Sequence, residues 1–445
     1  MAIVFPTLNH PLRALLAAEI HSRPPIRLEA PERITHLAVY GRNEAEKNHT
    51  IGVQTQLLTD LCIHYGVTPP TTEAKYFFHD FGHFRLKWEG HSEFSSFTFV
   101  SSVSTELTSQ SLFDHMPSDE LPDDWILRLQ GKLMVATHIV LERAAMGSDE
   151  AVPHMRQLFD NNPIVGSEVS QAAQVWTDFQ IHPSGFVRFV VRDAGLKGQQ
   201  AGRLVQRVIE IETYRKMAML GLPNAQRSIP ILNAIESELA SQTAAMVEMD
   251  KTGHKGDEVG MAEEQLLLER ITGLAARLEQ LAVENSYRFS ASQAYFKLVH
   301  SRIEELRERR IEGVPTINEF MQRRLTPAMN TCSSTDSRQK ALAERIANTN
   351  SLLRTRVGIR QEQQNNQILQ SMNTRAAQQL RLQQAVEGLS VVAVSYYLVG
   401  LISYAVKALK ATGLSIDTDL IVGAALPVLA VVVWLALKRL QKKLK

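Results

Sequence analysis

Cysteine is scarce in this chain: Cys62 and Cys332 are the only two among 445 residues. Two cysteines so far apart provide neither a disulfide framework nor the ligand spacing of a zinc site, which fits a reducing compartment. Signature motifs of enzymes are also missing. The sequence has no Gly-rich phosphate loop ending in Lys-Ser/Thr, no dinucleotide glycine fingerprint, no His-Glu-x-x-His and no Gly-x-Ser-x-Gly. We therefore expect a non-enzymatic protein, and the sequence identifies no cofactor.

An excess of charge of one sign is missing as well, because the net charge is only +1. A nucleic-acid-binding protein would show a broad basic face or stripe, so we expect no nucleic-acid partner. The N-terminus has no basic leader followed by an apolar run, and it does not resemble a secretory signal. These absences predict a large N-terminal part that stays inside the cell.

Long uncharged apolar runs are present, and they lie at the C-terminus. Residues 388–406 and 420–437 contain no Asp, Glu, Lys or Arg, and a short polar link joins them. Each run has about the 17 to 25 residues that a helix needs to cross a hydrocarbon core, and a helix satisfies its own backbone groups in lipid. The pattern predicts a two-helix transmembrane hairpin over residues 388–437, with the lipid bilayer as a partner.

Charge on either side of the hairpin predicts its orientation. Five cations follow the second run: Lys438, Arg439, Lys442, Lys443 and Lys445. The positive-inside rule places this basic tail, residues 438–445, at the cytoplasmic membrane surface. A hairpin returns to the side that it left, so we expect both termini to be cytoplasmic.

The two apolar runs differ in character. The first carries small and hydroxylated side chains, whereas the second is nearly all aliphatic. The residues that we expect at a membrane helix interface are Tyr396, Tyr397, Gly400, Ser403 and Tyr404. Small and hydroxylated residues allow close packing and hydrogen bonds between helices in lipid, which favours a homo-oligomer. The same face would also suit the lining of a pore.

The rest of the chain predicts an α+β cytoplasmic domain followed by a long α-helical stalk. Residues 1–197 contain short β-rich runs and one helical pattern at 52–66. Residues 198–334 are predominantly helical, although Pro327 and a Cys-Ser-Ser sequence indicate a link before residue 335. Residues 335–387 form the predicted stalk. Because so polar a helix is marginal alone, we expect it to pair with the helix at 261–310, with the same helix of a neighbouring subunit, or with both.

Two clusters are candidates for chemistry. His79, His83 and His91 are the weak candidates for metal ligands, because imidazole is a normal zinc ligand and odd-numbered residues of one strand share a face. The alternative is that these histidines lie on a solvated or partly buried sheet face. In the second cluster His21 and Arg23 precede a Pro-Pro pair. They would either bind a ligand or form a structural ion pair at the chain terminus.

Several long blocks together carry a resemblance to a known family. They are AEIHSRPPIRL at 18–28, FRLKWEGHSEFSSFTFV at 84–100, AGRLVQRVIEIETYRKMAMLGLP at 201–223, the sequence at 295–332 and the SYYLVGL start of the hairpin. The chain resembles the uncharacterised bacterial membrane-anchored proteins grouped as domain of unknown function 3422. This resemblance implies the inner (cytoplasmic) membrane as location and implies no activity.

The plan of the chain is also similar to that of CorA-type two-span cation channels. That group has Gly-Met-Asn at the outer end of the first span, where this chain reads Tyr404-Ala405-Val406-Lys407. Similarity of plan does not carry function. We therefore expect a membrane-anchored cytoplasmic protein that acts as an oligomeric binding or assembly module. A CorA-like divalent-cation channel or transporter is the alternative.

Overall fold

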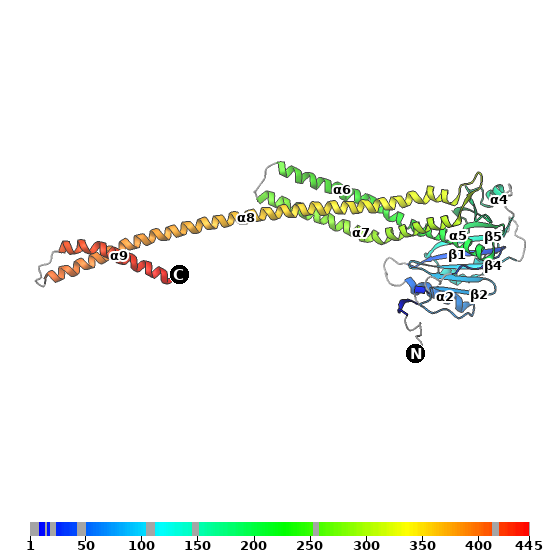
Figure 1. Cartoon of the computed structure of the whole chain (residues 1–445), viewed down its shortest axis with the longest axis horizontal. Helices are drawn as coiled ribbons and strands as arrows, with labels where there is room; N and C mark the ends of the chain where they lie inside the picture. The colour runs from blue at the N-terminus through cyan, green and yellow to red at the C-terminus, as the bar shows by residue number, and fades with distance from the viewer. Residues whose placement is uncertain are drawn as a thin grey trace. The chain divides into compact units, whose positions relative to one another are not determined.

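The structure is a computed structural model of the whole chain, shown in Figure 1. It describes residues 9–13, 16–17, 24–41, 50–103, 112–144, 151–251, 258–411 and 418–444. The chain divides into two compact units. The first contains residues 1–241 and 273–347, and the second contains residues 242–272 and 348–445. Three long helices, at residues 221–251, 258–306 and 317–411, therefore contribute to both units.

A mixed sheet is the centre of the first unit. Its strand order is β2-β3-β4-β1-β5-β8-β7-β6-β9, and every neighbouring pair is antiparallel except the parallel pair β5 and β8. The strands are β1 Glu32–Tyr40, β2 Tyr76–Asp80, β3 Arg85–Gly90, β4 Phe94–Ser102, β5 Leu133–Arg143, β6 Val165–Val169, β7 Ala173–Ile181, β8 Val187–Asp193 and β9 Arg309–Arg310. The sheet and the helices around it confirm the α+β fold predicted for the N-terminal part.

Side chains of each strand alternate between the two faces of this sheet, as the pleat of a strand requires. In β1, Leu37 and Val39 pack with α2 (Thr50–His64) and α3 (Asp123–Leu127) on one face. Ile34 and Ala38 pack on the opposite face, toward α5 (Gly198–Met219). A further cluster on the α2 side includes Trp176 and residues of α4 (Ala151–Leu158).

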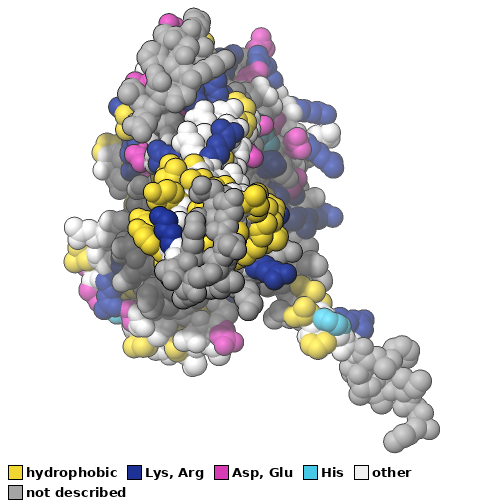
Figure 2. Space-filling view, turned by 90° about the vertical axis from the view of Figure 1, so that its left-hand side faces the viewer, with side chains coloured by type: hydrophobic (Ala, Val, Ile, Leu, Met, Phe, Trp, Pro, Cys, Tyr) yellow, Lys and Arg dark blue, Asp and Glu magenta, His cyan; other side chains and the backbone are white. Residues whose placement is uncertain are grey.

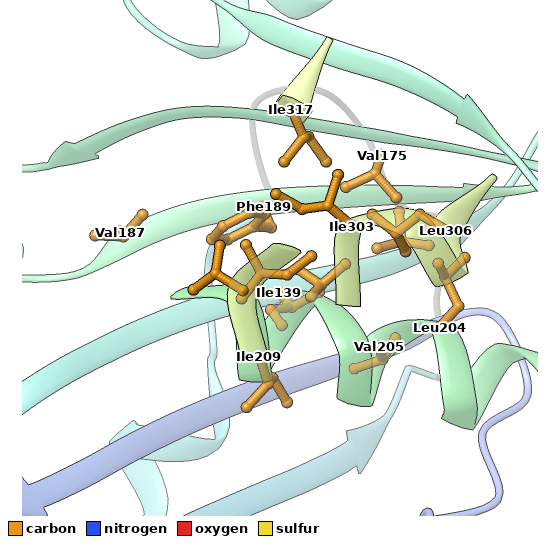
Figure 3. Packing of buried hydrophobic residues seen from close by; sticks show 14 of the residues in the cluster. Ile139, Val175, Val187, Phe189, Leu204, Val205, Ile209, Ile303, Leu306 and Ile317 are labelled. Atoms are coloured by element: carbon orange, nitrogen blue, oxygen red, sulfur yellow. The ribbon is translucent and has the colours of Figure 1, made fainter. Parts of the chain in front are cut away.

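The largest hydrophobic cluster lies between the sheet and α5, with the ends of two long helices, α7 (Glu258–Leu306) and α8 (Ile317–Ala411). Figure 3 shows its buried side chains pointing toward one another from six elements: Ile139 of β5, Val175 of β7, Val187 and Phe189 of β8, Leu204, Val205 and Ile209 of α5, Ile303 and Leu306 of α7, and Ile317 of α8. This cluster fixes α5 on the sheet. It thereby positions the polar residues of α5 that are described below.

One predicted break is wrong. The sequence indicated a link at Pro327 and Cys332–Ser334, but α8 continues through both without interruption. Leu325, Met329 and Cys332 are buried in the largest cluster, so packing stabilises helix in a stretch whose local sequence disfavours it. The missing N–H of Pro327 removes one helical hydrogen bond, a cost that buried contacts on both sides of the proline offset.

Helices of the first unit are joined by polar contacts that cross between them. Arg338 of α8 pairs with Glu236 of α6 (Gly221–Lys251) at 2.5 Å, and Arg277 of α7 pairs with Glu238 at 3.0 Å. In the second unit, Arg360 of α8 lies 3.1 Å from Glu264 of α7. The predicted stalk thus packs on the 261–310 helix of its own chain as far as Arg360. Beyond that residue nearly every described side chain of the stalk is exposed.

The second unit ends in the apolar segments. The C-terminal part of α8 is long and apolar enough to cross a membrane, and none of that stretch is buried. In α9 (Thr418–Leu444) the apolar part, Leu420–Ala436, is shorter. Figure 2 shows the face that lies on the left in Figure 1, with hydrophobic side chains in yellow near the centre of the view. Among the residues that the structure describes, one helix is thus long and apolar enough to span a membrane, and the second span stays a prediction.

Candidate ligand-binding cavity

A cavity of about 240 Å³ lies between α5 and strands β1, β3 and β4. Its apolar wall includes Ile26, Leu28, Ile34, Val100, Val205 and Ile209. Its polar wall includes His36, Lys87, Glu89, His91, Gln206, Glu210 and Arg302. Because a water molecule takes about 30 Å³ in the liquid, this volume equals roughly eight waters or one small organic molecule. The cavity is therefore amphipathic and of ligand size.

Strand β3 explains why one wall is polar. Leu86 and Trp88 are buried in the cluster on the α2 side. The alternate residues of the strand, Lys87 and Glu89, therefore face α5. A strand of this pattern usually exposes its polar side to water. Here α5 covers that side, and Lys87 is only 4 % exposed. The fold thus buries an ammonium group, which proteins rarely do without partners.

Two acceptors contact the buried ammonium of Lys87. Its Nζ lies 3.1 Å from Oε1 of Glu89 and donates a 3.4 Å hydrogen bond to Oε1 of Gln206. An ammonium has three N–H donors, and these two contacts are its polar partners among the described residues. One donor of Lys87 is therefore free to hold a ligand.

The polar wall continues from Gln206 across α5 to α7. Gln206 Nε2 donates to Oε1 of Glu210 at 2.8 Å, and Glu210 also forms an ion pair with Arg302. Arg302 in turn lies 2.6 Å from Glu305. The side-chain amide of Gln206 thus connects the oppositely charged Lys87 and Glu210, and Arg302 neutralises the charge of the Glu210 carboxylate.

His36 has a structural role in the cavity wall. Its Nδ1 lies 3.0 Å from Oγ1 of Thr98 on β4, and its Nε2 lies 3.2 Å from Oγ1 of Thr213 on α5. Burial, aided by the positive charge of Lys87, lowers the pKa of His36 to about 3. The imidazole is therefore neutral at physiological pH, and both ring nitrogens already have partners. His36 joins β1, β4 and α5 and is not positioned to transfer protons.

A segment near the N-terminus closes the cavity. Ile26 and Leu28 line it, and the Leu28 N–H donates to the carbonyl of Gly198 at 3.2 Å. The backbone of Ile26 approaches Gly202 so closely that a Cβ there would lie 1.8 Å from the Ile26 carbonyl oxygen. Only glycine fits at position 202, because any side chain would push this segment off α5. The described part of the 18–28 block thus builds a cavity wall.

The three candidate metal histidines are not brought together. His79 pairs across the sheet with Leu86 and lies on the α2 face, where its ring is 5.0 Å from that of Phe81. His91 lines the cavity on the opposite face and stacks on Phe94 at 4.3 Å, and His83 is exposed in the turn between β2 and β3. No group of three His, Cys, Asp or Glu side chains within the described ranges is arranged for a metal ion. The prediction assumed that odd-numbered residues of one continuous strand share a face. Turns after His79 and before Phe94 interrupt the strand, so His79 and His91 lie on opposite faces of the sheet.

Glu93, next to this histidine set, is buried with another partner. Its carboxylate accepts two hydrogen bonds from Arg288 of α7, at 2.8 and 3.1 Å. Glu93 is 1 % exposed and Arg288 is 9 % exposed. Burial, with the charge of Glu93 nearby, raises the pKa of Tyr295. This bidentate pair fixes α7 to the sheet.

The other predicted sites have separate outcomes. His21 and Arg23 lie outside the described residues. Lys438 and Arg439 are exposed in α9, and Lys438 Nζ lies 4.5 Å above the ring of Trp434. The side chains of Lys442 and Lys443, and all of Lys445, are not described.

The predicted membrane interface is exposed in the single chain. Tyr396, Tyr397 and Tyr404 are 72 to 76 % exposed, and Gly400 and Ser403 are partly buried. Val406 of α8 and Val433 of α9 are the buried hydrophobic residues of the two apolar segments. The tyrosine face thus has no cover within the described chain, and its contact with another subunit stays a prediction.

Sequence reasoning missed the cavity and its central residues, His36 and Lys87. One signal was available: α5 places Gln206, Glu210 and Thr213 along the side that also carries Gly202. A helix that combines small and polar residues on its packed side indicates that it covers a polar surface.

Comparison with known proteins gives a family and no activity. The model of the family described as "Protein of unknown function (DUF3422)" matches residues 8–444. No curated protein matches the chain. The match covers nearly the whole chain, including residues of both units, and confirms the resemblance predicted from the sequence. It offers no support for similarity to CorA-type channels.

Proposed function

This chain belongs to the DUF3422 family, whose description names no activity, and we infer its function from its own residues. We propose that it is a membrane-anchored cytoplasmic protein whose α+β unit binds a small amphipathic molecule in the cavity beneath α5. The observation that carries this proposal is the buried ammonium of Lys87, which has an unused donor and faces a cavity of about 240 Å³.

The walls define the chemistry of the ligand. Lys87 would donate to a carboxylate or carbonyl oxygen, and Glu89 beside it would accept from an amine or amide. Ile26, Leu28 and Val205 would contact an apolar part of a few carbon atoms. Cavities of about 300 to 1,000 Å³ usually hold drug-sized ligands, so this one suits a smaller molecule.

Three probes share the same apolar part but carry different polar groups: isovalerate, leucine and leucinamide. Comparing them shows which polar group the cavity binds. Binding is measured as the shift in thermal midpoint of the full chain in detergent. We expect at least one probe to raise the midpoint of the wild type and of Lys132→Met, an exposed control on the same sheet unit, but not of Lys87→Met. If no probe raises the midpoint, or if Lys87→Met responds as the wild type does, the cavity does not bind this class of ligand.

Membrane anchorage is the second part of the proposal. It is supported by the exposed apolar stretch of α8 and by the apolar helix Leu420–Ala436 that follows it. We propose that both cross the bacterial inner membrane as a hairpin and leave both termini in the cytoplasm, since Lys438 and Arg439 follow the second helix.

Cysteine labelling tests this topology directly. Cys62 and Cys332 are both buried, so an introduced cysteine would dominate the reaction with a membrane-impermeant maleimide. We expect Ser415→Cys, in the link between the helices, to react in spheroplasts. Gln441→Cys, in the tail, should react only after the membrane is opened. Reaction at both positions before opening would contradict the hairpin.

Assembly into a homo-oligomer is supported by apolar side chains that the single chain leaves exposed on α8. Leu369, Met372 and Leu380 are 57 to 62 % exposed and recur at helical spacing. A mass measurement of the detergent-solubilised protein should give a multiple of 49.9 kDa, reduced in Met372→Glu but not in Gln378→Glu. A monomeric wild type would contradict assembly. It would also exclude the alternative of a CorA-like channel with a central path, which liposome flux of divalent cations tests separately.

A further inference from the structure

Four arginines converge on a second depression of the first unit, distinct from the cavity. Arg203 and Arg207 come from α5, Arg307 follows the end of α7, and Arg309 lies in β9. The depression measures about 750 Å³, and Ser170, Gln171 and Gln200 also line it. We call this surface the arginine groove.

Acidic residues in the arginine groove are already engaged. Glu308 accepts hydrogen bonds from Ser167 Oγ at 2.6 Å and from the backbone N–H groups of Ile317 and Asn318 at 3.0 Å, so it caps the start of α8. Glu305 pairs with Arg207 at 2.9 Å and with Arg302. These contacts leave little negative charge for the remaining guanidinium groups.

The side chains of the other three arginines line the groove and have no partner among the described residues. Arg203, Arg307 and Arg309 are exposed, and none of them forms an ion pair or hydrogen bond through its side chain within the described ranges. Like charges on neighbouring residues repel one another, and a bound anion removes that repulsion. Guanidinium groups also match phosphate oxygens in a bidentate way. The charge balance of the arginine groove thus favours an anion with several oxygen acceptors.

Backbone conformation marks the same surface. Ser170, Gln171 and Arg307 have φ values of +54°, +58° and +52°. They account for three of the seven non-glycine residues with positive φ in the described chain. Arg307 occupies the position after a helix where glycine is usual. Strained residues of this kind persist at functional sites. Glycine at position 307 would relieve this strain, whereas arginine adds a cationic side chain to the groove.

We propose that the arginine groove binds a phosphorylated anion, held by Arg203, Arg307 and Arg309. The first turn of α5 supports the same charge preference, because Gln200 of that turn lines the groove and a helix N-terminus attracts anions. The phosphate would belong either to a soluble molecule or to a lipid headgroup. This inference does not depend on the ligand of the cavity or on membrane topology.

Inorganic pyrophosphate is the probe, titrated by calorimetry into the full chain in nanodiscs of phosphatidylcholine at low salt. We expect saturable binding, weakened at least tenfold in Arg307→Gly and in Arg309→Gln, and unchanged in Arg324→Gln, an exposed control on α8. Arg307→Gly is the informative variant, because glycine relieves the positive φ and should raise the thermal midpoint. A loss of affinity together with a higher midpoint cannot result from unfolding.

A second arm distinguishes the two sources of phosphate. The titration is repeated in nanodiscs that contain phosphatidic acid. Weaker pyrophosphate binding there than in phosphatidylcholine would show that a lipid headgroup competes for the arginine groove. Equal binding in both nanodiscs would assign the groove to a soluble phosphate. Absence of saturable binding in both, or equal weakening by Arg324→Gln, would overturn the proposal.

Discussion

Replacing Gly202 by alanine should destabilise the sheet unit, although the same change in an ordinary helix is stabilising. A glycine inside a helix is about 1 kcal/mol worse than alanine, so Gly→Ala usually raises stability. At position 202 the new Cβ would lie 1.8 Å from the carbonyl oxygen of Ile26. Real Cβ contacts are not this short, so the segment that carries Ile26 and Leu28 must leave α5.

The cost follows from what that segment buries. Ile26 and Leu28 are 9 % and 2 % exposed, and burial of each side chain is worth about 1.5 to 3 kcal/mol. Loss of both, offset by the helix propensity of alanine, predicts a decrease of about 2 to 5 kcal/mol in the free energy of unfolding. For a unit of about 300 residues, whose unfolding entropy is roughly 0.6 kcal/mol per kelvin, the thermal midpoint should fall by roughly 3 to 8 °C.

Tryptophan fluorescence measures this change, since Trp88, Trp125 and Trp176 are all buried in the first unit. A Trp434→Phe background removes the signal of α9. The matched control is Gly273→Ala, because Gly273 lies in α7 of the same unit and has no atom within 4 Å of an added Cβ. We expect this control to gain about 1 kcal/mol. If Gly202→Ala is as stable as the control, the segment does not pack on α5 and the cavity lacks that wall.

Two further predictions concern buried charge. Glu93→Leu should lower the free energy of unfolding, measured by urea denaturation, by about 3 to 5 kcal/mol, because it leaves Arg288 charged and buried. The double variant Glu93→Leu/Arg288→Met should recover most of this lost free energy. Equal effects of the single and double variants would contradict the coupling between Glu93 and Arg288. Stability should also fall with acid, since the unfolded state binds a proton at His36 below pH 6.5 while the folded state does so only near pH 3. His36→Gln should therefore reduce the slope of the free energy of unfolding against pH by about 1.4 kcal/mol per pH unit between pH 6 and 5. An unchanged slope would mean that His36 is already protonated in the folded state.

Local patterns predicted most of the elements, and the exceptions have physical reasons. Strand β1 is one of the β-rich runs expected in residues 1–197, because residues 34–40 are rich in β-branched and apolar side chains. Strand β6 was missed because Gly166 and Ser167 weaken its pattern, yet its pairing with β7 forms it. The helix across Pro327 was missed for the opposite reason, since tertiary contacts override a residue that usually ends helices.

The candidate site was less predictable than the fold. Lys87 sits in a strand whose alternation is typical of a half-exposed sheet, and no local property indicates that α5 lies above it. The arginines of the groove are likewise separated by about a hundred residues in the chain. Such sites depend on which elements meet, and that depends on packing between distant segments.

The sequence by itself determined the apolar C-terminal helices, the α+β character of the N-terminal part and the family. These are properties of consecutive residues or of long sequence blocks. Only the tertiary structure decided that Lys87 is buried and that His36 lies between two threonines. It also decided that three arginines with no side-chain partner in the described part of the chain share one groove. The physical reason is that burial and charge pairing arise between segments far apart in the chain, once α5 covers the sheet.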